Sequence, residues 1–98
     1  MSLLVRYTLK SADDHAHQSA AMEALVAGLR ADGVPVHYSC FTTDDPTRFI
    51  GLLEFDDDAG QQAFLNSAAF AAYKEAVGPT FAKPPETIEI AAIASTRT

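Results

Sequence analysis

The chain has 98 residues and is 48% hydrophobic, which excludes a disordered protein and predicts one modest core in a single domain, residues 1–98. Its net charge of −6, with seven scattered Lys and Arg, argues against nucleic acid and membrane surfaces as partners. The lone Cys40 excludes an internal disulfide and is typical of a reducing compartment, so we expect a cytoplasmic protein.

The first half of the chain reads as strand, helix and strand. Residues 3–10 alternate between apolar and polar side chains, which predicts a strand. Residues 15–31 follow an acidic pair and carry apolar residues at helical spacing, which predicts a helix. Small residues such as Gly28 are expected to let this helix lie close to a sheet. Residues 34–43 alternate again and predict a second strand.

The second half repeats this order. Residues 48–55 predict a third strand, and three consecutive aspartates then open a second helix. We expect that helix to be interrupted near Ser67 and to end at Gly78, which a proline follows. Residues 86–94, rich in Ile and Ala, predict the last strand.

The order β-α-β-β-α-β predicts an α+β fold of the ferredoxin-like type. Right-handed crossovers place both helices on one face of a four-stranded antiparallel sheet. The opposite face is too apolar for solvent and too polar for a dry core. Its expected members are Leu4, Arg6, Thr8, His37, Ser39, Phe41, Ile50, Leu52, Glu54, Ala91 and Ile93. We therefore expect a second copy of the chain to cover this face in a homodimer.

Two runs of sequence resemble a known family. They are LLEFDDD at residues 52–58 and FLNSAAFAAY at residues 64–73, set in the predicted β-α-β-β-α-β order. Together they resemble the antibiotic-biosynthesis-monooxygenase-like family, whose members are dimeric α+β barrels. The resemblance implies a small pocket between sheet and helices. Some members oxidise quinol-like or polyketide aromatics with O₂ and no bound metal or flavin, others degrade haem, and many have no known activity.

The two chemistries of the family place different residues on the second helix. Haem-degrading relatives have a Trp and a His there and an Asn on the first strand. This chain has Phe64 at the Trp position, Lys74 (or Tyr73, if the alignment slips by one) at the His position and no Asn beside Tyr7, so haem degradation is disfavoured. Quinol-oxidising relatives often have an Asn followed by a Trp and a Tyr. Here Asn66 is followed by Phe70 and Tyr73, with Phe in place of Trp.

Three tyrosines are predicted on positions that face the core. If the hydroxyls of Tyr7, Tyr38 and Tyr73 converge, they could hold an oxygenated aromatic ligand, with Phe64 and Phe70 as apolar walls. The alternative is that each tyrosine is an ordinary core residue with its hydroxyl at the rim.

The candidate catalytic residues are Tyr73, Asn66 and His37. His37 could act as a base only if the strand register turns it toward the core, and an interface histidine is the alternative. The sequence contains no known metal-binding spacing. His15 and His17 could bind a metal, but they lie at a helix start, where charged and polar groups are expected anyway. We expect neither metal nor cofactor.

Two functions remain open at this point. The first is a cofactor-independent monooxygenase that acts on a small hydroxylated aromatic with O₂, which would make the protein an oxidoreductase. The second is a non-catalytic, dimeric protein that binds a small molecule or serves as an accessory module. The second predicts a pocket that is small or filled by aromatic side chains.

Overall fold

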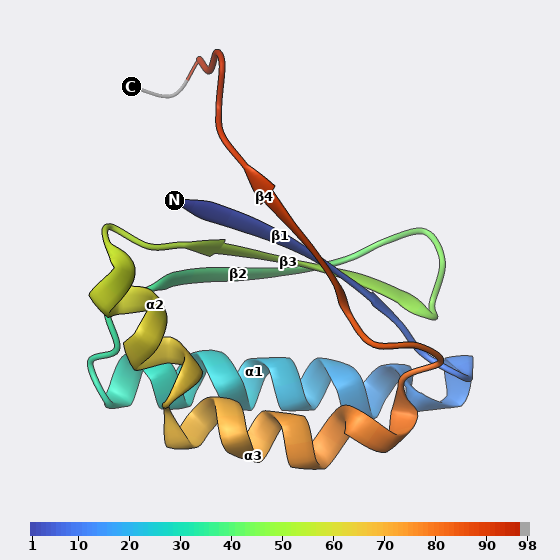
Figure 1. Ribbon diagram of the computed structural model, residues 1–98. Helices are drawn as coiled ribbons and strands as arrows, with labels where there is room; N and C mark the ends of the chain where they lie inside the picture. Colours follow the sequence, from blue (N-terminus) through green and yellow to red (C-terminus); the bar gives the residue numbers. More distant parts are fainter. Residues whose placement is uncertain (97–98) are drawn as a thin grey trace.

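The computed structural model describes residues 1–96 and has the predicted alternation of strands and helices (Figure 1). In chain order the elements are β1 (Ser2–Thr8), the 3₁₀ helix η1 (Ala12–Asp14), α1 (His15–Ala31), β2 (His37–Thr42), β3 (Arg48–Glu54), α2 (Asp58–Leu65), α3 (Ala68–Val77), the 3₁₀ helix η2 (Gly78–Thr80) and β4 (Glu86–Ile90). The four strands form one antiparallel sheet in the order β2-β3-β1-β4. The α+β, ferredoxin-like fold is therefore confirmed.

Both long helices cover the same face of the sheet. In Figure 1, α1 and α3 run side by side beneath the strands, and α2 lies at one end of the sheet. The core fills the space between the two layers, with strand residues Val5, Phe49 and Leu53 packed against Leu25 and Val77 of the helices. Among residues 1–96, no helix has the length and apolar character needed to cross a bilayer.

The predicted interruption of the second helix lies at Asn66 and Ser67. The Ser67 hydroxyl accepts a hydrogen bond from the Phe70 N–H (3.1 Å), which is the usual role of serine at a helix start. The Asp57 carboxylate caps α2 in the same way through the Gly60 N–H (2.9 Å). Two separately capped helices therefore replace one continuous helix.

Two strand boundaries differ from the predictions by three residues or more, and β1, which ends at Thr8 and not at residue 10, and the other ends differ by one or two. β4 ends at Ile90 and not at residue 94, because its partner strand begins there: Ile90 pairs with Ser2, the first residue of β1. Strand β2 begins at His37 and not at residue 34. Residues 34–36 do not pair in the sheet: the backbone N–H of Val34 donates to the carbonyl of Leu29 at the end of α1 (3.0 Å), and that of Val36 donates to the carbonyl of Val34 (2.8 Å).

The sheet face opposite the helices has most of its expected members. The register places Leu4 between Leu52 and Ile88, and it places Arg6 between Ile50 and Glu86. Ala91 and Ile93 were expected on this face, but both lie beyond the end of β4. The residues that β4 contributes are Glu86, Ile88 and Ile90. We call this surface the outer face.

Candidate functional site

An apolar cavity of about 570 Å³ opens between the sheet and helices α2 and α3. Its floor comes from β1 and β3, and its walls come from α2, α3 and the segment that leads into β4. The side chains that give it its character are Tyr7, Phe64, Phe70, Tyr73, Lys74 and Phe81. A concave, largely apolar site with a few polar groups is typical of small-molecule binding.

Aromatic rings form much of the wall. The rings of Phe64 and Phe70 lie 4.5 Å apart between centroids, where the end of α2 meets the start of α3. On the opposite side Phe81 stacks on Tyr7 at 5.8 Å, and the ring of Tyr73 meets Tyr7 edge-on at 6.4 Å. Such offset and edge-on pairs are favourable geometries for aromatic rings, so the wall is well packed.

Behind this wall, tyrosine hydroxyls come together in the middle of the protein. Tyr7 Oη and Tyr38 Oη are 2.8 Å apart and share a hydrogen bond. Gln18 on α1 donates a hydrogen bond of 2.7 Å from Nε2 to Tyr73 Oη. Gln18 is completely buried, and its Oε1 has no hydrogen-bond partner within the described part of the chain. We call these four residues the tyrosine cluster.

Gly51 makes room for the cluster. It lies on β3 between the strands that carry Tyr7 and Tyr38. A Cβ atom at this position would stand 2.9 Å from Cε1 of Tyr38 and 3.2 Å from Cε2 of Tyr7. Only glycine therefore lets the two rings lie over the strand and bring their hydroxyls into contact.

Burial keeps the tyrosines protonated. It raises the pKa of Tyr7 to about 12, and it also raises the pKa values of Tyr38 and Tyr73, with the nearby Tyr7 hydroxyl as a further cause for both. Burial likewise raises the pKa of the Cys40 thiol, which disfavours the reactive thiolate. At neutral pH the tyrosines can therefore donate hydrogen bonds to an anionic oxygen, but they cannot take a proton from a ligand.

The residues proposed from sequence are divided between the cavity and other places. Phe64, Phe70, Tyr7 and Tyr73 line the cavity. Tyr38 does not, although its hydroxyl contacts Tyr7 and its ring meets Phe64 edge-on at 6.1 Å.

Two candidate catalytic residues lie away from the cavity. Asn66 is exposed just after the end of α2, and it is absent from the cavity lining. His37 is exposed on the outer face, opposite Glu54. The register thus turns His37 away from the core, which removes the condition under which it could act as a base on a ligand in the cavity.

Gln18, Lys74 and Phe81 contribute to the site but were not predicted as site residues. Gln18 lies on the buried stripe of α1, and a polar residue at helical spacing with apolar ones was the available signal. Phe81 lies between η2 and β4, where a bridge between Leu9 and Phe81 holds the backbone beside β1. A lone large aromatic in a connector was its only sequence signal.

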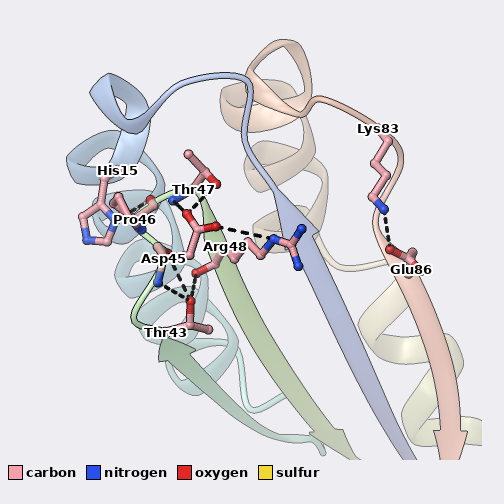
Figure 2. A network of polar contacts seen from close by, with 8 residues as sticks. All are labelled: His15, Thr43, Asp45, Pro46, Thr47, Arg48, Lys83 and Glu86. Carbon is pink, nitrogen blue, oxygen red and sulfur yellow. Dashed lines mark hydrogen bonds and ion pairs between the residues drawn. The ribbon is translucent and has the colours of Figure 1, made fainter.

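A second hollow, of about 740 Å³, lies at one end of the sheet and is lined mainly by charged and polar residues. Figure 2 shows that several of these groups contact one another in two separate sets, one around Asp45 and the other formed by Lys83 and Glu86. Asp45 accepts hydrogen bonds from the backbone and hydroxyl of Thr47 (2.9 and 2.7 Å), which lower the pKa of its carboxyl. Lys83 pairs with Glu86 at 2.8 Å, and Arg48 lies 3.6 Å from Asp45. This network fixes a loop and leaves the apolar cavity as the better candidate site.

The histidines near the start of α1 also have structural partners. His15 hydrogen-bonds through Nδ1 to the carbonyl of Pro46 (2.9 Å), as Figure 2 shows, and His17 hydrogen-bonds through Nε2 to the carbonyl of Ala76 (2.8 Å). Across residues 1–96, no three His, Cys, Asp or Glu side chains gather in a way that could hold a metal ion.

Comparison with known proteins shows the fold. No protein-family model and no protein with a curated description matches the chain. The structure is nevertheless similar to that of an antibiotic biosynthesis monooxygenase, with a TM-score of 0.82 and 15% identity over 95% of this chain and 98% of the other. A candidate enzyme of the same name from Caulobacter crescentus gives 0.83 and 16% identity, over 95% of this chain and 89% of that one.

A Nitrosomonas europaea protein of unknown function has the same architecture, with a TM-score of 0.78 and 21% identity over 96% of this chain and 89% of that one. The chain thus has the fold of the antibiotic biosynthesis monooxygenases, and the resemblance expected from its sequence is confirmed as a likeness of fold. A fold shared at such low identity does not carry a substrate with it.

Proposed function

We propose that the protein is a cofactor-independent, monooxygenase-like protein that binds a small hydroxylated aromatic of the quinol or polyketide type and promotes its reaction with O₂. The observation that supports this proposal is the pairing of an aromatic-walled cavity with protonated tyrosines at its lining. The phenylalanine rings would hold the flat ligand. Tyr7 and Tyr73 would bind its oxygen.

The protein would assist the reaction by stabilising the deprotonated ligand. Oxidation by O₂ starts from the electron-rich phenolate or enolate, and hydrogen-bond donors in a dry site favour that anion. In the described part of the chain no carboxylate or histidine lines the cavity, so solvent would take the proton. For an anthrone-like ligand, a CH₂ group and O₂ become a carbonyl and one molecule of water, which balances atoms and electrons without a further reductant.

We also propose that the protein acts as a homodimer through the outer face. Phe41 is 49% exposed there, and Ile88 and Ile90 are 38% and 37% exposed. Within residues 1–96, α1 and α3 lie on the opposite face of the sheet and α2 lies at one end of it, so none of these helices covers the outer face (Figure 1). Large exposed apolar side chains on one sheet face are typical of an interface.

The open cavity of about 570 Å³ goes against the small or filled pocket that was expected of a binding or accessory protein without catalysis. Two other observations favour this alternative: no side chain among residues 1–96 that lines the cavity could take a proton, and Phe70 stands where quinol-oxidising relatives often have Trp. The same cavity could therefore hold a hydroxylated aromatic without changing it.

Oxygen uptake separates the two functions. Purified protein is mixed with reduced naphthoquinols and anthrone-like aromatics, and autoxidation without protein is subtracted. We expect protein-dependent uptake that falls about tenfold to a hundredfold in Tyr73→Phe, because one donor to the anion is lost. Tyr38→Phe is the matched control: it loses the same atom outside the cavity lining and should lose less activity.

The outcomes of this experiment are distinct. Binding of the aromatics by calorimetry without uptake would contradict catalysis and support the binding protein. Absence of both binding and uptake, with circular dichroism of a folded protein, would contradict the proposed function.

A further inference from the structure

Among residues 1–96, Lys74 is the one charged residue that lines the apolar cavity. The residue is exposed and also belongs to the lining, so it stands at the mouth of the cavity, where the lining meets solvent. Its Nζ lies 4.7 Å from the centre of the Phe70 ring, and this ring is itself part of the wall. A cation–π contact of this kind keeps the ammonium over the entrance.

The ammonium of Lys74 has no carboxylate partner among residues 1–96. Lys83 is paired with Glu86, and Arg48 lies beside Asp45, so each of these cations is matched by an acidic group. Lys74 is matched by an aromatic ring only. It can therefore bind an anion without first breaking an ion pair.

The negative net charge of the chain makes a cation at the mouth of the cavity an indicator of which ligand binds there. With a net charge of −6, the protein repels anionic molecules in general. The cavity itself is apolar, so it offers a charged group nothing to replace its lost water. An unpaired cation at the entrance is the one local feature that would favour an acid over a neutral molecule.

We propose that the ligand of this cavity is an aromatic that carries a carboxylate, and that the carboxylate binds Lys74 at the mouth. This inference rests on the proposed function and narrows its substrate class. The hydroxylated ring would lie against the paired rings of Phe64 and Phe70 and reach toward Tyr7 and Tyr73, while the acid stays at the solvent boundary. Lys74 would then decide which aromatics bind, and it would take no part in the reaction with O₂.

The simpler account is that Phe70 and Lys74 form an ordinary helix pair. They are four residues apart on α3, and such pairs stabilise a helix weakly. That role predicts the same effect of Lys74 on every ligand. A ligand-binding role predicts an effect on acids alone, which makes the two accounts separable.

The test uses a hydroxynaphthoate and its methyl ester, which share the ring and hydroxyl but differ in charge. Dissociation constants are measured by calorimetry for the wild-type protein, Lys74→Gln and Lys74→Arg. Lys83→Gln serves as the matched control, because it removes a lysine that does not line the cavity. All four proteins are checked for folding by circular dichroism.

We expect Lys74→Gln to weaken binding of the acid about twofold to fivefold, which is the upper part of the range for an exposed ion pair. Binding of the ester should change less than about twofold, and Lys74→Arg should keep the preference for the acid because it keeps the charge. Lys83→Gln should leave both ligands unaffected. Added salt should weaken acid binding in the wild type and have little effect in Lys74→Gln.

An equal change for acid and ester in Lys74→Gln, or no change for either, would overturn the inference while the cavity and the proposed function stand. If neither compound binds the wild-type protein, the proposed function fails and the inference fails with it.

Discussion

Gln18 is fully buried at a position where the helical pattern of α1 is otherwise apolar. Its Nε2 donates to Tyr73, whereas its Oε1 lacks a partner in the part of the chain that the structure describes. An unsatisfied buried acceptor costs about 1–3 kcal/mol, so an apolar residue would serve the core better. The hydrogen bond from Gln18 fixes the position of the Tyr73 hydroxyl. The hydroxyl's own proton remains available for donation to another acceptor.

The buried tyrosines predict a loss of stability in alkali. The ordinary tyrosine pKa is 10.0, and burial raises the pKa of Tyr7 to about 12. Between these values the unfolded chain loses protons that the folded chain keeps. The free energy of unfolding is therefore fully retained below pH 10.0 and falls as the pH rises toward about 12, by at most about 1.4 kcal/mol per pH unit for each tyrosine.

Urea unfolding at a series of alkaline pH values measures this effect. Tyr7→Phe should make the decline less steep, because it removes one of the groups that titrate differently in the two states. A stability that stays constant across this range would show that the tyrosines titrate normally in the folded protein.

At the scale of elements, the contact between α1 and α3 holds the site together. Gly28 on α1 faces Ala69 on α3, and a Cβ atom at Gly28 would stand only 2.9 Å from that of Ala69. The sequence predicted that Gly28 lets α1 approach the sheet, but its neighbour is the other helix. The close approach brings α3 near enough to α1 for Tyr73 to meet Gln18.

We therefore predict that Gly28→Ala destabilises the protein, although alanine is the better helix former by about 1 kcal/mol. The clash with Ala69 must push the helices apart. Adding Ala69→Gly should remove the clash, so the double variant should be more stable than the sum of the single changes by about 1–2 kcal/mol. Urea unfolding of the three variants gives this coupling energy, and a value near zero would mean that the helices separate freely.

At the scale of the whole molecule, we propose that the outer face is the surface through which the protein associates with a second copy. Leu4 and Leu52 are neighbours at its centre, and Arg6 lies beside Glu86 on the next row. An apolar centre bordered by charged residues is the pattern expected for a surface that binds its own copy.

Leu52→Glu should convert the proposed dimer to a monomer, because a carboxylate at the centre of the interface would lose its water without a partner. Analytical ultracentrifugation measures the mass directly. Ala72→Glu is the control, since it adds the same charge at an exposed position of α3. A wild-type monomer, or a dimer that survives Leu52→Glu, would place the interface elsewhere or remove it.

The features that the sequence could predict depend on local signals. The span of α1 follows from its apolar spacing, and the break before α3 follows from the capping preference of Ser67. The end of β4 could not be predicted, because it depends on where β1 begins, far away in the chain.

The residues of the candidate site also separate into those that local signals predict and those that depend on long-range contacts. Alternation along the strand was enough to place Tyr7 toward the core. The position of His37 depends on strand register, and the packing of Phe81 depends on how a connector folds back over the sheet. These are long-range properties, which is why the aromatic wall was predicted only in part.

The tyrosine cluster also gives the protein an optical property. The chain has three tyrosines and no tryptophan, and all three tyrosines are in the cluster. The intrinsic fluorescence of the whole protein therefore arises beside the cavity, whose lining includes the rings of Tyr7 and Tyr73. A molecule that enters the cavity would touch the emitting groups themselves, so the unlabelled protein reports on its own occupancy.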